Sequence, residues 1–203
     1  MRNLPNLLSL GRLLATIPLV ALVLINTAPA YLGATVLFAL GSVTDTLDGR
    51  LARRYHLVSR LGVFLDLTAD KVFVSAALIA LVQVRMVPAW IAIVIVTREF
   101  LVSGLRSLAA AQGVVIPAGA AGKQKTLLTL TAIGGILLAR GLGGATAFPL
   151  GLSTSEKAPT AFADYLLAVS DVLLLLAVLW TLYSALDYLR GAWGVLTGPV
   201  KEG

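Results

Sequence analysis

The sequence contains no cysteine and only one histidine, His56. The lack of cysteine excludes disulfides, thiolate metal sites and cysteine nucleophiles, and one histidine excludes a His-rich metal site. Charged residues are also scarce, at 13% of the chain, whereas a soluble domain has about 25%. Hydrophobic residues make up 58% of the 203 residues, and the mean hydropathy is +0.92. This composition predicts an integral membrane protein.

Six long apolar stretches are separated by proline, glycine or charged residues. A membrane-spanning helix needs about 20 mostly apolar residues, and the stretches lie at about 10–27, 31–52, 62–84, 88–108, 124–140 and 162–189. We therefore predict an all-α polytopic protein with six transmembrane helices, forming a single domain over residues 1–203. The first stretch, followed by Ala28-Pro29-Ala30, is also similar to a signal peptide. Because the rest of the chain is polytopic, we interpret this stretch as an uncleaved anchor.

The basic residues predict the orientation. A net charge of +6 is compatible with nucleic-acid binding, but in membrane proteins basic residues collect in cytoplasmic loops. With the N-terminus inside, eleven fall on the cytoplasmic side: Arg2, Arg12, Arg50, Arg53, Arg54, Arg60, Arg106, Lys123, Lys125, Arg190 and Lys201. Three fall outside: Arg85, Arg140 and Lys157. The asymmetry predicts that both termini are cytoplasmic, and it explains the charge without a nucleic-acid partner.

Four aspartates stand in this apolar setting. Asp45 and Asp48 project from one side of the second predicted helix, and Asp66 and Asp70, four residues apart, share one face of the third. We expect these two helices to be antiparallel neighbours joined by a short loop. All four carboxylates then lie at one depth, just inside the cytoplasmic boundary. Each carboxylate costs about 2.5–3.5 kcal/mol at the bilayer centre, and clustered carboxylates repel one another. Divalent cations remove both problems.

The ligand type narrows the choice of metal. Oxygen-only ligands suit hard ions such as Mg²⁺, Mn²⁺ or Ca²⁺ and not Zn²⁺. Four carboxylates can hold two such ions, an arrangement used in phosphoryl chemistry. Gly49 and Ala52 lie on the same side as Asp45 and Asp48. They leave room either for a ligand or for a closely packed neighbouring helix.

The spacing Asp45-x2-Asp48-Gly49-x2-Ala52-Arg53-x8-Gly62-x3-Asp66-x3-Asp70 resembles the signature of the CDP-alcohol phosphotransferase family. Three further segments extend the resemblance along most of the chain: NLPNLLSLGR at 3–12, TREFLVSGLR at 97–106 and GKQKT at 122–126. The last two are similar to the bacterial phosphatidylglycerophosphate synthases of the family. There are two departures, because Leu67 stands where many members have proline and Ser9 where threonine is common.

The resemblance implies transfer of a phosphatidyl group from CDP-diacylglycerol to an alcohol, with release of CMP. It implies that Asp45, Asp48, Asp66 and Asp70 bind two Mg²⁺ or Mn²⁺ ions, with Asp70 as general base. The implied CDP-binding residues are Asn6, Ser9, Arg12, Asp48, Gly49, Ala52, Arg53 and Gly62. It also implies a homodimer among membrane lipids, in a bacterial plasma membrane with the active site facing the cytoplasm.

The second half of the chain indicates the acceptor. Arg98 lies within a predicted span, where a charge usually marks a functional site. Arg106 lies near the cytoplasmic end of the same helix, and Lys123 and Lys125 open the next. Such a cationic pocket suits an acceptor that carries its own phosphate, although membrane anchoring explains the two lysines equally well. Glu99 follows Arg98 directly, so we expect it to point elsewhere and to be a poor partner.

Together with the local resemblance, the cationic pocket favours sn-glycerol 3-phosphate as acceptor and phosphatidylglycerophosphate as product. Inositol phosphate is the alternative acceptor. A cation transporter, a different class of protein, would spread its acids along a path or break helices at mid-membrane. Here the acids cluster near one face beside arginines, which disfavours a transporter. Aromatic residues near the span ends are interpreted as interfacial anchors: Trp90, Trp180, Tyr183, Tyr188 and Trp193.

Overall fold

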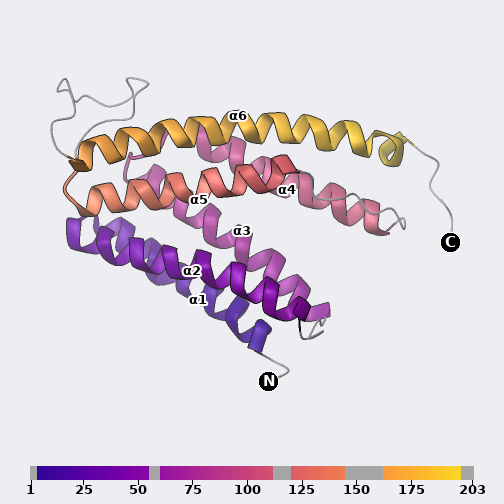
Figure 1. Cartoon of the computed structure of the whole chain (residues 1–203), viewed down its shortest axis with the longest axis horizontal. Coiled ribbons are helices and arrows are strands. Elements are labelled where there is room, and N and C mark those ends of the chain that lie inside the picture. Colours follow the sequence, from indigo (N-terminus) through magenta and orange to yellow (C-terminus); the bar gives the residue numbers. More distant parts are fainter. Residues whose placement is uncertain (1–3, 55–59, 112–119, 145–161, 198–203) are drawn as a thin grey trace.

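The computed structural model describes residues 4–54, 60–111, 120–144 and 162–197, and this part of the chain is all-helical. Its helices are α1 (Leu4–Ile25), α2 (Ala28–Arg54), α3 (Arg60–Gln83), α4 (Ala89–Ala111), α5 (Ala120–Gly141) and α6 (Phe162–Thr197). Side chains are described except at 4–6, 45–54, 60–61, 63–64, 66, 111, 120–121, 123 and 191–197. The predicted all-α class and the six predicted helical segments are confirmed (Figure 1).

Several helices extend beyond the apolar stretches that predicted them. Helix α1 begins at Leu4, α5 begins at Ala120 and α6 continues to Thr197, because helical hydrogen bonding continues into polar sequence where hydropathy falls. The break predicted at 27–31 is shorter than expected. Helix α2 begins at Ala28, since Pro29 in the first turn lacks only an N–H that would have no intrahelical partner there.

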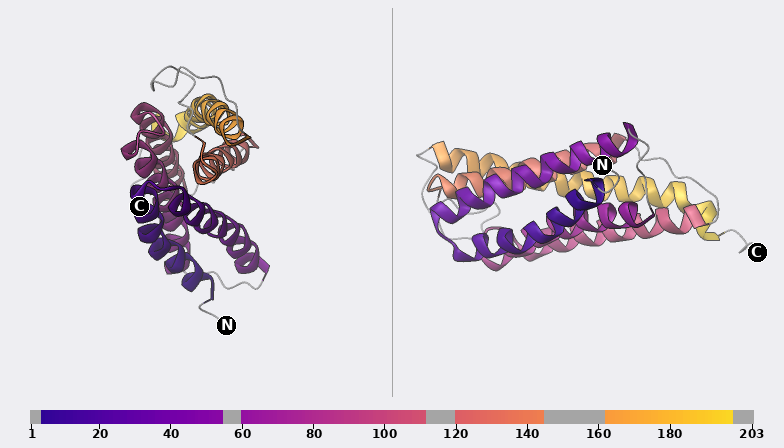
Figure 2. Two further views of the ribbon diagram at one scale, coloured as in Figure 1. Left: turned by 90° about the vertical axis from the view of Figure 1, so that its left-hand side faces the viewer. Right: turned by 90° about the horizontal axis from the view of Figure 1, so that it is seen from below.

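The six helices close into a ring. Helix α1 packs on α2 and α3, α5 packs on α2 and α6, and α4 joins α6 to α3. The order around the ring is therefore α1–α2–α5–α6–α4–α3, visible nearly end-on in Figure 2 (left) with α1 and α2 lowest. Phe38 on α2 stacks on Phe73 on α3, with ring centroids 5.4 Å apart. Both rings are buried in the core, so they fix the spacing of the two helices that carry the aspartates.

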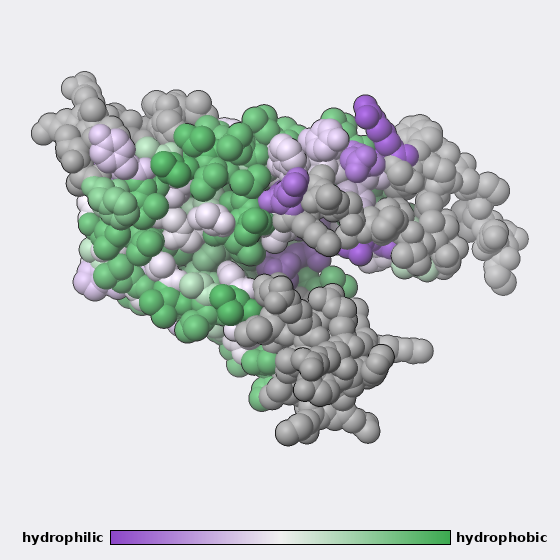
Figure 3. All heavy atoms as spheres, viewed as in Figure 1, coloured by the Kyte–Doolittle hydropathy of each residue, from purple (hydrophilic) through white to green (hydrophobic). Residues whose placement is uncertain are grey.

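The helices alternate in direction, so functional residues far apart in sequence share one end of the bundle. The N-terminal ends of α1, α3 and α5 and the C-terminal ends of α2, α4 and α6 all point towards the right in Figure 1, with the start of α5 nearer the middle. We call this the polar end. Hydrophilic side chains gather towards it, and apolar side chains cover most of the remaining face in Figure 3.

Within the residues that the structure describes, two helices contain segments long and apolar enough to cross a membrane, Leu7–Ile25 and Phe162–Arg190, and Ala28–Thr44 is a shorter apolar segment. Large apolar side chains also point outward, with Ile17 70% and Leu179 63% exposed. Soluble monomers rarely expose contiguous apolar patches larger than a few hundred Å². These features agree with membrane association, and the crossing of all six helices stays a prediction.

Candidate active site

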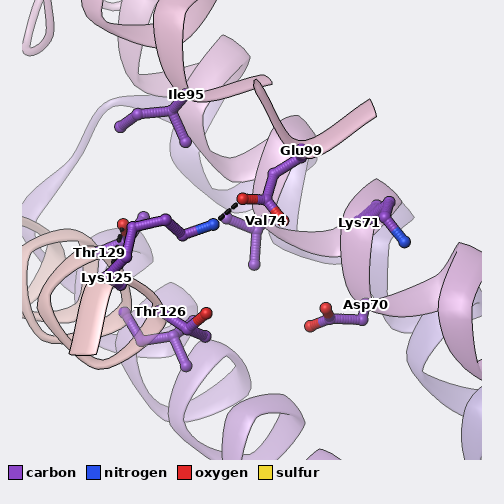
Figure 4. Close-up of a pocket in the computed structure, with 9 residues that line it drawn as sticks. Asp70, Lys71, Val74, Ile95, Glu99, Lys125, Thr126 and Thr129 are labelled. Carbon is purple, nitrogen blue, oxygen red and sulfur yellow. Dashed lines mark hydrogen bonds and ion pairs between the residues drawn. The ribbon is translucent and has the colours of Figure 1, made fainter. Parts of the chain in front are cut away.

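The four aspartates reach the polar end on two helices. Asp45 and Asp48 lie in the C-terminal half of α2, and Asp66 and Asp70 lie in the N-terminal half of α3. The side chains of the first three are outside the described part of the structure. Asp70 is partly buried, and its carboxylate points towards a pocket (Figure 4).

This pocket lies inside the ring, between α3, α4 and α5, and has a volume of about 30 Å³. Its polar lining is Asp70, Lys71, Glu99, Lys125, Thr126 and Thr129, and its apolar lining is Val74, Ile95 and Leu130. Asp70 and Lys125 face it from opposite sides (Figure 4). A predicted base and a predicted phosphate-binding cation thus share one cavity.

Glu99 is the carboxylate in this pocket whose role the sequence reasoning missed. Its Oε1 accepts a hydrogen bond from Arg98 Nη1 at 3.2 Å, and the same oxygen forms an ion pair with Lys125 Nζ. The expectation that Glu99 points away from Arg98 is therefore wrong. Adjacent Cβ atoms diverge on a helix, but both side chains are long enough to curve back towards each other. The lysine from α5 provides a second cation at the same place.

Arg98, on α4, contacts two residues of α6. Its Nη2 donates a hydrogen bond to Ser184 Oγ, and its guanidinium carbon lies 5.5 Å from the centre of the Tyr188 ring, a cation–π distance. Tyr188 is only 7% exposed, so its interpretation as an interfacial anchor is wrong. Trp180 and Tyr183 on α6 are exposed, as anchors would be.

The other predicted residues divide into three groups. Ser9 and Arg12 are buried on α1, which packs on the two aspartate-bearing helices. Arg106 is exposed and does not line the pocket, and Gly62 is partly buried. The side chains of the rest lie outside the described residues: Asn6, Gly49, Ala52, Arg53 and Lys123.

A model of the family described as CDP-alcohol phosphatidyltransferase matches residues 2–183. The chain belongs to this family. The resemblance drawn from the aspartate spacing is thereby confirmed, and the chain is an enzyme.

Curated relatives of this phosphatidyltransferase cover most of its length. A Bacillus subtilis (strain 168) protein named CDP-diacylglycerol–glycerol-3-phosphate 3-phosphatidyltransferase is 37% identical over 209 residues, covering 97% of this chain and 98% of the relative. A Pseudomonas fluorescens protein of the same name is 36% identical, covering 94% and 90%. A Mycobacterium tuberculosis protein named probable phosphatidylglycerophosphate synthase is 39% identical over 136 residues, covering 65% and 64%.

The donor set of this phosphatidyltransferase fits hard divalent cations. The predicted ligands are all carboxylates, they lie on two helices at the same end of the bundle, and the chain has no thiolate. Among the side chains that the structure describes, no group of three or more His, Cys, Asp or Glu could hold a metal. Three of the four predicted ligands lie outside that part, so their arrangement around a metal stays a prediction.

Proposed function

We propose that this phosphatidyltransferase transfers the phosphatidyl group of CDP-diacylglycerol to sn-glycerol 3-phosphate, giving phosphatidylglycerophosphate and CMP. The observation that carries the proposal is the shared pocket of Asp70 and Lys125 at the polar end. One residue can accept the proton of an attacking hydroxyl, and the other can bind a phosphate on the same substrate. The names of the Bacillus and Pseudomonas relatives, which match nearly the whole chain, support this choice of donor and acceptor.

The acceptor hydroxyl attacks the phosphorus of the phosphatidyl group, and the bond between that phosphorus and the oxygen of the departing CMP breaks. Asp70 accepts the hydroxyl proton. Lys125 and Arg98 hold the acceptor phosphate, so that the attacking oxygen is positioned before the reaction. Lys123 adds charge at the start of α5. Arg106, exposed on α4, steers the anionic acceptor towards the polar end.

The donor is held from the side of α1 and α2. Ser9 and Arg12, both buried, act with six residues of the neighbouring segments on the CDP moiety: Asn6, Asp48, Gly49, Ala52, Arg53 and Gly62. Two Mg²⁺ or Mn²⁺ ions would be held by Asp45, Asp48, Asp66 and Asp70, and would supply positive charge against the pyrophosphate.

We further propose that all six helices cross a bacterial plasma membrane, with both termini and the active site facing the cytoplasm, and that the enzyme is a homodimer. The common end shared by the described ends of α1 and α6 agrees with an even number of crossings. Native mass spectrometry of the detergent-extracted protein should give twice the mass of the chain, and a monomer would refute the dimer.

An acceptor panel tests the reaction. Purified enzyme is incubated with CDP-diacylglycerol, Mg²⁺ or Mn²⁺, and one of glycerol 3-phosphate, inositol phosphate, inositol or serine, and CMP release is measured. We expect release with glycerol 3-phosphate and its loss on chelation of the metal. Turnover of inositol phosphate without turnover of glycerol 3-phosphate would overturn the assignment of the acceptor.

A further inference from the structure

One carboxylate in the pocket serves two cations. Glu99 Oε1 accepts from Arg98 Nη1 at 3.2 Å and pairs with Lys125 Nζ, as the dashed line in Figure 4 marks. The Arg98 and Lys125 side chains are only 9% and 4% exposed. Buried cations need a counter-charge, since an unpaired charge removed from water costs several kcal/mol. Glu99 is therefore a counter-ion for both.

Among the side chains that the structure describes around Glu99, positive charge exceeds negative charge. The pocket is also lined by Asp70 and Lys71, whose formal charges cancel. The two cations bound to Glu99 therefore exceed its charge by one. The α6 groups that contact Arg98, a serine hydroxyl and a tyrosine ring, are neutral. The surroundings thus favour an anion with more charge than a single carboxylate.

We propose that Glu99 determines acceptor specificity by occupying, in the empty enzyme, the place of the acceptor phosphate. This inference rests on the proposed function and assigns the competitor at the same site. A phosphate monoester carries close to two negative charges and several acceptor oxygens. It can satisfy Arg98 and Lys125 together, as the carboxylate does. An uncharged alcohol offers nothing to replace the carboxylate, so the empty pocket discriminates against it.

Glu99 thus acts against ligands that cannot replace its negative charge beside Arg98 and Lys125. Specificity often depends on a repulsive element as well as on attraction to the right ligand. Glu99→Gln keeps the size of the side chain and removes its charge. The pocket then holds two cations without their carboxylate, and simple anions should bind there.

Calorimetric titration with inorganic sulfate tests this directly. Wild type and Glu99→Gln are titrated in metal-free buffer, so that sulfate cannot bind through a metal ion. We expect sulfate to bind Glu99→Gln at least about tenfold more tightly, since close buried charge pairs couple by more than 1.4 kcal/mol. Equal sulfate affinity in the two proteins would overturn the proposal.

Matched variants separate the local effect from general charge. Asp187→Asn removes the same charge from an exposed position on α6, near the polar end, and should leave sulfate affinity unchanged. In a Lys125→Met background, Glu99→Gln should tighten sulfate binding less than it does in the wild type, because only Arg98 is then left without its carboxylate. Tightening that is undiminished without Lys125, or that also appears in Asp187→Asn, would contradict the role of Glu99 as counter-ion of the two cations. If Glu99→Gln does not fold, Glu99→Asp, which keeps the charge on a shorter side chain, should give a smaller tightening, and an affinity equal to wild type would then count against the proposal.

Turnover provides the second readout. In Glu99→Gln the KM for glycerol 3-phosphate should fall, because its phosphate no longer competes with the carboxylate. The KM for CDP-diacylglycerol should stay the same, and a general packing defect would not separate the two constants. The two proposals fail separately. If the wild type used a different phosphorylated acceptor, the sulfate result would still stand. If sulfate affinity did not differ between wild type and Glu99→Gln, the role of Glu99 would fall, and the proposed phosphatidyl transfer would still stand.

Discussion

Arg98 on α4 donates a hydrogen bond to Ser184 on α6, a residue 86 positions away in the sequence. The bond joins two helices that are neighbours in the ring. A second guanidinium nitrogen of Arg98, Nη1, donates a hydrogen bond to Glu99 in the pocket. The position of a pocket residue is thereby tied to the packing of the last helix.

Ser184→Ala should destabilise the protein by about 1–3 kcal/mol, because it removes a hydrogen-bond acceptor from a buried charged group. Ser184 is fully buried, whereas Ser107 on α4 is exposed, so Ser107→Ala is the matched control and should have little effect. Thermal unfolding in detergent, followed by circular dichroism, measures both. Equal unfolding temperatures for the two variants would show that the bond to Arg98 contributes nothing to stability.

Gly41→Ala should also be destabilising. A Cβ at this position of α2 would lie 2.5 Å from Phe73 Cζ, and the Phe73 ring is stacked on Phe38. Overpacking of this kind costs about 1–3 kcal/mol. Since Phe73 lies three residues from Asp70 on α3, we also expect CMP release to fall.

Gly104→Ala is the control for this substitution. A Cβ on Gly104 of α4 would have nothing within 4 Å, and alanine is the better helix former by about 1 kcal/mol. Gly104→Ala should be neutral or stabilising in the same unfolding assay. A loss of stability as large as that of Gly41→Ala would refute the steric explanation.

The helical class and the common end of the aspartates could be predicted because they depend on local features. Apolar stretches of about 20 residues identify the helices, and the four-residue spacing places Asp66 and Asp70 on one face of α3. The Glu99–Lys125 pair could not be predicted in this way. It depends on which helices become neighbours in the ring, and hydropathy does not encode that order. The better signal was Glu99 itself, an acid within an apolar stretch.

The sequence also does not show which way individual side chains face around an apolar helix. Helix α6 is apolar on all sides, so its sequence does not show that Tyr188 faces inward. On α4, Arg106 was predicted to join Arg98 at the pocket. Helix α4 packs mainly on α3 and α6, and the Arg106 side chain is exposed. Its contact with the acceptor stays a prediction.

The absence of cysteine makes the predicted topology directly testable. A single cysteine at Lys157 should react with a membrane-impermeant maleimide in right-side-out vesicles, because this residue is predicted to lie outside. A single cysteine at Lys201 should react only after permeabilisation. Labelling of both before permeabilisation would contradict an even number of crossings with cytoplasmic termini.

Asp70→Asn should lower the rate of CMP release by about 10²–10⁴-fold, the usual contribution of a general base. The amide keeps the shape of the side chain but cannot accept the hydroxyl proton. The variant should still fold and bind CDP-diacylglycerol, so its kcat should fall much more than its donor affinity. Binding of the donor is measured by calorimetry and turnover by CMP release. Asp187→Asn, exposed on α6, is the control and should retain wild-type turnover. A fully active Asp70→Asn enzyme would remove Asp70 from the reaction and leave it, at most, as one of the four predicted metal ligands.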